Sequence, residues 1–157
     1  MKRYVIVLLL LLFVVVGCNN NTKKENNNNN NKHTPTPTPA EESFVVINLF
    51  HWSECSHCQE EIEWLKEVEK RNDKIKVNYY EVTEYEDLVD QVRTELGIMG
   101  EGVPLTVIGS DYILGFSDSM KARIMNLVDK YQEKDYCDIV PLIENSEDTT
   151  NCYLQNS

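Results

Sequence analysis

Residues 44–58 read FVVINLFHWSECSHC and place two cysteines directly after a nearly continuous apolar run. The run at 44–50 is rich in β-branched residues, which predicts a strand covered on both faces. Over 56–70, apolar residues recur at helical spacing while Glu and Lys fill the other face. The chain therefore joins a buried strand to a helix whose first turn contains Cys55 and Cys58, and no other feature constrains the fold as strongly.

Similar patterns predict the remaining elements of the domain. These are a strand at 74–82, a helix at 84–96, strands at 105–108 and 112–115, and a last helix that begins at Ser117 or Asp118 and ends near 134. Only a Gly-Ser-Asp turn separates the last two strands, so they must form an antiparallel hairpin. The expected fold class is α/β, with the element order βαβαββα.

This arrangement resembles a known family. A strand that runs into CxxC at a helix start, followed by Val103-Pro104 ahead of a hairpin and a final helix, resembles the thioredoxin-like superfamily in its minimal, glutaredoxin-sized form. The resemblance covers residues 44–134 and implies a mixed four-stranded sheet with helices on both faces. It also implies a cis bond before Pro104, beside the CxxC, and a backbone at Val103 that pairs with a bound substrate strand.

The two cysteines of the CxxC are expected to have different roles. Cys55 lies at or before the first turn of the helix, where unpaired N–H groups and the helix dipole favour a thiolate. Cys58 lies on the core-facing stripe of the same helix. We therefore expect Cys55 to attack a substrate disulfide and Cys58 to release the mixed disulfide, a thiol–disulfide exchange that needs no bound cofactor.

The residues around the CxxC affect the reactivity expected of Cys55. Protonated His57 would stabilise a thiolate at Cys55, whereas Glu54 would oppose it. A His just before the second cysteine resembles the bacterial disulfide-forming oxidoreductases, which favours an oxidant, but oxidation, reduction and isomerisation all stay open. Leu49 stands where thioredoxins proper have a buried acid, so the pattern departs from a thioredoxin-style proton shuttle. Trp52 either covers the active sulfur or packs against the domain.

Two other interpretations of the CxxC stay open. The pair could form a structural disulfide without turnover, as in degenerate members of the superfamily. Alternatively, Cys55, Cys58 and His51, with His57, could bind a soft ion such as Cu(I). The alternative function is therefore a noncatalytic binding protein on the same fold, either a metal carrier or an accessory to a membrane complex.

The N-terminal segment predicts export and a lipid anchor. Lys2 and Arg3 precede an apolar run that ends in Val-Val-Gly-Cys18, which resembles the lipobox of bacterial lipoproteins. The expected signal peptide is 1–17, and acyl chains on Cys18 would hold the protein durably at a membrane. Residues 18–43 then form a disordered tether of Asn and Thr-Pro repeats. We expect an extracytoplasmic protein on the cell surface, facing the wall of a one-membrane cell rather than a periplasm.

The charge of the chain limits its partners. The formal net charge is −11 for the whole sequence, and the first 17 residues hold two of its basic groups. Nucleic acid is therefore not an expected partner, because phosphate binding requires the opposite sign. The expected partners are protein thiols and disulfides, the membrane through the anchor, and a membrane-bound or thioredoxin-like redox partner.

A C-terminal extension at 135–157 contributes the last two cysteines, Cys137 and Cys152. Without Cys18, the four remaining cysteines permit three pairings, and a Cys137–Cys152 bridge leaves the CxxC intact. Export makes a permanent structural bridge plausible. The functional alternative is a second redox pair that relays electrons to Cys58.

Overall fold

The computed structural model describes residues 44–133 and 135–157, so the predicted signal peptide, Cys18 and the tether lie outside the described residues. The elements follow in the order β1 (Val45–His51), α2 (Ser56–Arg71), β2 (Ile75–Glu81), α3 (Glu86–Glu95), β3 (Leu105–Ile108), β4 (Asp111–Leu114), α4 (Asp118–Gln132), α5 (Ile139–Glu144) and α6 (Thr150–Asn156). None of these helices combines the length and apolar character needed to cross a bilayer.

The strands form one mixed sheet in the order β2-β1-β3-β4. Strand β1 is parallel to β2, with Val45 opposite Ile75. It is antiparallel to β3, with Phe50 opposite Leu105, and β3 is antiparallel to β4. The predicted α/β class and mixed four-stranded sheet are therefore confirmed. This register places the C-terminal end of β1 beside the N-terminal end of β3.

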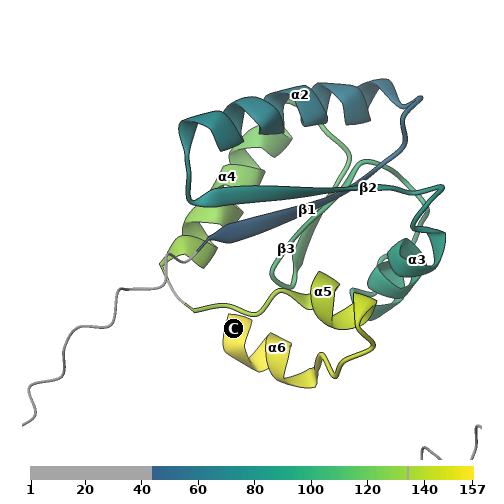
Figure 1. Cartoon of the computed structure of the whole chain (residues 1–157), viewed down its shortest axis with the longest axis vertical. Coiled ribbons are helices and arrows are strands. Elements are labelled where there is room, and N and C mark those ends of the chain that lie inside the picture. Colours follow the sequence, from purple (N-terminus) through teal and green to yellow (C-terminus); the bar gives the residue numbers. More distant parts are fainter. Residues whose placement is uncertain (1–43, 134) are drawn as a thin grey trace, which may run out of the picture. The chain divides into compact units, whose positions relative to one another are not determined.

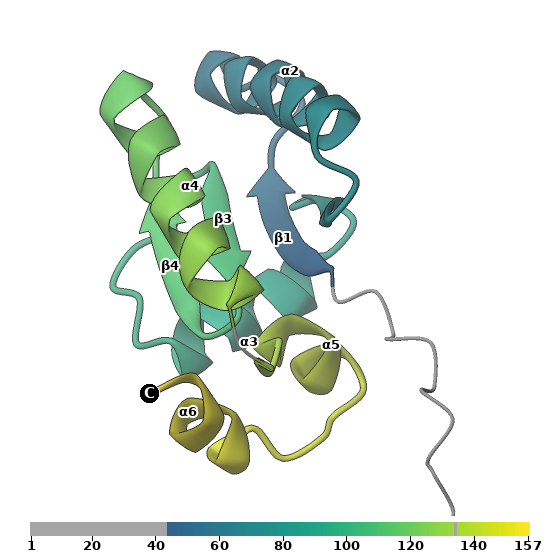
Figure 2. The same cartoon turned by 90° about the vertical axis from the view of Figure 1, so that its left-hand side faces the viewer.

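Helices cover both faces of this sheet (Figures 1 and 2). Helices α2 and α4 pack on one face, where Ile47 and Leu49 of β1 meet Leu65 and Ile124. Helices α3 and α5 pack on the other face, against Phe50. Each fully buried aliphatic or aromatic side chain contributes roughly 1.5–3 kcal/mol. The two apolar layers explain why β1 is a nearly continuous apolar run.

The predicted ends of the elements differ from the observed ends by at most two residues, and the strand at 105–108 matches at both ends. Helix α3 begins at Glu86 rather than at 84, and it ends at Glu95 because a Schellman motif closes it around Gly97, which has a φ of 64°. In this motif the N–H of Ile98 donates to the carbonyl of Arg93 (2.8 Å), and the N–H of Gly97 donates to that of Thr94 (3.2 Å).

The C-terminal extension folds into two short helices that the sequence pattern did not predict. Cys137 and Cys152 form a disulfide. Ile139, Val140 and Ile143 of α5 are buried in the same core as α3. The extension therefore completes the apolar layer on this face of the sheet.

Candidate functional site: the cysteine pair and its neighbours

Cys55 is the N-cap residue of α2. Its backbone is extended, and its sulfur accepts a hydrogen bond from the N–H of Cys58 (3.3 Å). The N–H of Cys55 donates to the carbonyl of Trp52 (3.0 Å), which fixes the turn between β1 and α2. The sulfur of Cys55 therefore lies where the first amide groups of the helix point, an environment that favours a negative charge.

Cys58 lies one turn further along α2 and is fully buried. Both Cys55 and Cys58 are free thiols in this structure. Burial, then the hydrogen bond with Cys55, and also the charge of Glu61 raise the pKa of the Cys58 thiol to about 12. The two sulfurs thus have unequal environments, and Cys58 needs a proton acceptor before it can act as a nucleophile.

The loop before β3 lies beside Cys55. The Val103-Pro104 peptide bond is cis, and the Cys55 sulfur lies 4.0 Å from the carbonyl oxygen of Val103. The antiparallel register of β1 and β3 brings these segments together, since Cys55 follows β1 and Pro104 immediately precedes β3. Pro104 is buried and Val103 is partly exposed. Within the described part of the chain, no backbone–backbone hydrogen bond engages Val103, and its carbonyl accepts only from the Cys55 thiol.

The structure places the other predicted site residues as follows. Trp52 is 42% exposed, so it is not a core residue. The side chain of His57 is also exposed, and its Nδ1 atom lies 3.6 Å from a carboxylate oxygen of Glu60. Among the described residues, His57 forms no hydrogen bond with either sulfur.

His51, which the metal-site interpretation requires, belongs to the end of β1. Its Nδ1 atom lies 3.4 Å from a carboxylate oxygen of Glu81 on the neighbouring strand β2. Over 44–133 and 135–157, no group of three or more His, Cys, Asp or Glu side chains is arranged to hold a metal ion.

Glu61 is a candidate functional residue that the sequence analysis missed. It is fully buried, and the hydroxyl of Thr106 donates to its Oε1 atom (2.5 Å). Its Oε2 atom has no hydrogen-bond partner among the described residues. Burial raises the pKa of Glu61 to about 7, although the Thr106 hydrogen bond acts in the opposite direction. Glu61 is therefore a buried acid that can exchange a proton near neutral pH.

The expectation that Glu and Lys fill the face of this helix opposite the apolar stripe was wrong for Glu61. Glu61 lies three residues after Cys58 and four before Leu65, and all three are buried. The helical spacing of Glu61 therefore indicated that it is buried. The residue type indicated the opposite, because carboxylates are rarely found in a core. Thr106, in the otherwise apolar β3, supplies the polar partner.

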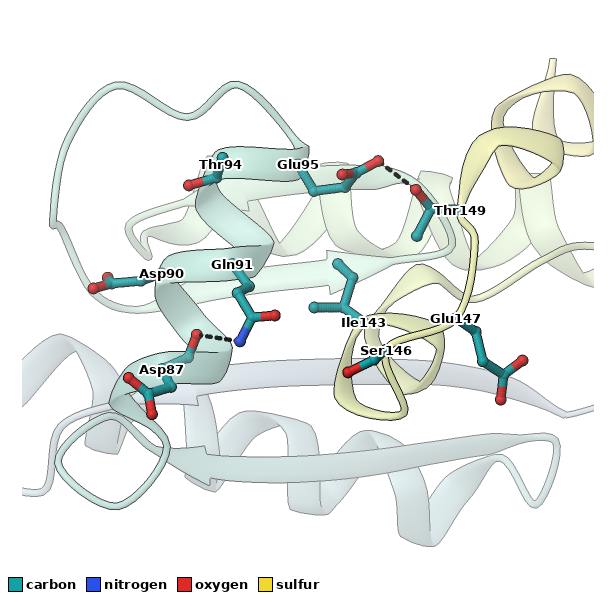
Figure 3. A pocket seen from close by; sticks show the side chains of 9 residues that line it. All are labelled: Asp87, Asp90, Gln91, Thr94, Glu95, Ile143, Ser146, Glu147 and Thr149. Atoms are coloured by element: carbon teal, nitrogen blue, oxygen red, sulfur yellow. Dashed lines mark hydrogen bonds between the residues drawn. The ribbon is translucent and has the colours of Figure 1, made fainter.

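A cavity of about 600 Å³ lies between α3 and the C-terminal extension (Figure 3). Figure 3 shows Ile143 between the two segments and a hydrogen bond from Thr149 to Glu95 that closes one side. The carboxylates of Asp90 and Glu147 point away from each other in this view. No residue of the CxxC segment lines this cavity, so it is separate from the site described above.

Three segments meet at Cys55: the turn after β1, the start of α2 and the loop before β3. They bring together an accessible sulfur, a buried second thiol, a buried acid and an open backbone edge. In comparisons with known proteins, no family model matches this chain, and no curated protein matches it.

Proposed function

We propose that this chain is a thiol–disulfide oxidoreductase with a thioredoxin-like fold, in which Cys55 and Cys58 exchange disulfides with protein substrates. The observation that carries the proposal is the unequal environment of the two sulfurs. Cys55 is partly exposed and accepts a helix N–H, whereas Cys58 is buried behind it. This division suits an attacking and a resolving thiol, and a purely structural disulfide does not need it.

In the first step, the Cys55 thiolate attacks one sulfur of a substrate disulfide. A bond forms between Cys55 and that sulfur, while the substrate bond breaks and its other sulfur leaves as a thiolate. The partly exposed position of Cys55 permits this approach. The free backbone edge at Val103 would hold the substrate segment by main-chain hydrogen bonds, as in strand addition.

In the second step, Cys58 attacks the sulfur of Cys55. The Cys58 proton passes to the carboxylate of Glu61, and a Cys55–Cys58 disulfide forms. The substrate sulfur that was bound to Cys55 leaves as a thiolate. Two electrons have then moved from the cysteine pair to the substrate. The same steps in reverse oxidise a substrate dithiol, and a membrane-bound or thioredoxin-like redox partner would reset the pair.

The roles proposed for His57 and for the N-terminal segment rest on where these residues lie in the chain. His57 would tune Cys55 through its charge, because its side chain is exposed next to the pair. The predicted signal peptide and the lipobox-like Cys18 support the proposal of an extracytoplasmic location on a lipid anchor, in a compartment where disulfides persist.

A trapping experiment in cells tests the proposal. In a Cys58→Ser variant of the full-length chain, mixed disulfides with substrates cannot be resolved, so they should accumulate through Cys55 after thiols are quenched. The matched Cys55→Ser variant should trap none. A Cys58→Ser protein that is expressed and anchored but forms no thiol-sensitive adducts would contradict the mechanism.

A second experiment separates the enzyme from a metal carrier. The purified chain should reduce insulin disulfides or oxidise a reduced substrate, and alkylation should modify Cys55 much faster than Cys58. Tight Cu(I) binding together with negligible exchange would instead support a carrier and reject the enzyme.

A further inference from the structure

A groove of about 440 Å³ begins next to the reactive sulfur. Trp52 and Val103 form the end near Cys55, and these are the two residues whose carbonyl groups contact Cys55. Val82 and Val89 add apolar side chains further along. A substrate segment that pairs with Val103 would therefore continue into this groove.

The polar lining of the groove is mainly acidic. Glu86 and Asp90 come from one face of α3, and Glu101 comes from the loop before β3. All three side chains are exposed, so they are available to a bound segment. Within the described part of the chain, neither Glu86 nor Glu101 forms an ion pair.

Arg93 is the only basic residue that lines the groove, and its guanidinium is already engaged. Nη1 lies 3.3 Å from Asp90 Oδ1, and Nη2 donates to the carbonyls of Glu101 (3.2 Å) and Gly102 (3.4 Å). Its side chain is 12% exposed. Arg93 therefore holds the loop against α3, while three carboxylates and one guanidinium leave the groove with a net negative charge.

We infer that this groove selects substrates in which the disulfide is flanked by Lys or Arg within an extended, unfolded segment. The inference rests on the proposed oxidoreductase function and adds its substrate class. The apolar walls would contact the stems of long basic side chains, and the carboxylates of Glu86 and Glu101 would face their charges. Acidic segments would be repelled by the same carboxylates.

The test uses the full-length chain in detergent and two short Gly/Ser-based peptides, each with one disulfide. Lys flanks the disulfide in the first peptide and Glu in the second. Starting from the dithiol form of the chain, the Lys peptide should be reduced in a single turnover with a second-order rate constant about tenfold higher at low salt, mainly through tighter binding, and the ratio should shrink as ionic strength rises.

A double variant, Glu86→Gln with Glu101→Gln, should bring the two rates close together. The matched control, Glu63→Gln with Asp129→Asn, removes the same charge from α2 and α4 on the opposite face of the sheet and should keep the preference. Equal rates in the wild-type chain, or a preference that survives in the groove variant, would overturn the inference while leaving the enzyme intact.

A binding measurement separates the two proposals. The same peptides with Ser in place of Cys cannot react, so their affinities report on the groove alone. If no disulfide peptide is turned over, the proposed function fails. A Lys-over-Glu difference in affinity that the groove variant abolishes would still support the groove, and equal affinities would reject it.

Discussion

Glu61 is the residue that most changes the interpretation of this site. It is the only carboxyl group among the fully buried side chains of the described chain. A carboxylate in a core is destabilised in its charged form, and Thr106 compensates for only one of its two oxygens. The result is an acid with a pKa of about 7 that lies three residues after a thiol with a pKa of about 12 on the same helix. In the proposed mechanism its carboxylate accepts the proton of Cys58.

We predict that Glu61→Gln slows the second step of exchange, in which Cys58 attacks the mixed disulfide. General-base catalysis typically contributes about 10²–10⁴-fold, so a loss of at least tenfold is expected. The measurement is the release rate from a preformed mixed disulfide on Cys55, followed against pH. The wild-type rate should rise through pH 7, and the variant should lose this rise.

The control for this prediction is Glu63→Gln, on an exposed position of the same helix. Attack by Cys55 on a substrate should stay unchanged in both variants, because Glu61 contacts neither the substrate nor the Val103 loop in the proposed mechanism. A Glu61→Gln chain that keeps the wild-type rate and pH profile for release would remove Glu61 from the mechanism.

At the scale of elements, the C-terminal extension is attached to the sheet by polar as well as apolar contacts. Asp138 caps α5 through the N–H of Val140 (3.2 Å) and accepts hydrogen bonds from the side chain of Asn48 (2.9 and 3.1 Å) in the middle of β1. Asn48 is fully buried, and the side chain of Asn78 donates to it (2.9 Å). This network compensates for a polar residue inside a central strand.

The disulfide of the extension gives a prediction at this scale. Changing both Cys137 and Cys152 to Ser should lower the free energy of unfolding by about 3 kcal/mol, because the bridge closes a loop with a sequence separation of 15 residues. Urea unfolding measures this loss. Exchange by the Cys55–Cys58 pair should continue below the unfolding transition, since neither Cys137 nor Cys152 lines the groove beside Cys55.

The relay alternative gives the opposite kinetic result. If Cys137 and Cys152 pass electrons to Cys58, the double Ser variant should stop after one turnover when the redox partner is supplied. A folded variant with full multiple turnover would reject the relay.

At the scale of the whole molecule, the fully buried Glu61 and the half-buried Asp138 both contribute to how stability depends on pH. Burial raises the pKa of Glu61 from 4.5 to about 7 and that of Asp138 from 3.8 to about 6. Because both values are higher in the folded state, the folded chain binds these protons more tightly than the unfolded chain. Their contribution to stability is therefore fully present at acidic pH and is lost as the pH rises toward 7.

We predict that the free energy of unfolding falls between about pH 4 and pH 7, with a contribution from Glu61 on the order of 3 kcal/mol. Denaturant unfolding at several pH values measures this slope. In a plot of the unfolding free energy against pH, Glu61→Gln should reduce the slope toward pH 7, and Asp138→Asn should reduce the slope toward pH 4. If Glu61→Gln and Asp138→Asn leave the pH dependence of the unfolding free energy unchanged, neither acid has a raised pKa in the folded chain.

Much of the fold followed from patterns that are local along the chain. The run at 44–50 and the spacing of apolar residues after it predicted β1 and α2, because burial on a strand and on a helix repeats with fixed periods. These patterns did not predict the last two short helices, α5 and α6. They have too few residues for a period to show, and contacts of Ile139 and Ile143 with a distant core stabilise them.

The sequence by itself determined that two cysteines lie at the start of a helix after a buried strand, because this depends only on neighbours in the chain. Only the tertiary structure decided what surrounds them. The register of β1 and β3 brings Val103 to Cys55, and the packing of α2 on the sheet buries Glu61 against Thr106. Such contacts join residues that are dozens of positions apart, so no local pattern records them, and they decide where a proton and a substrate can go.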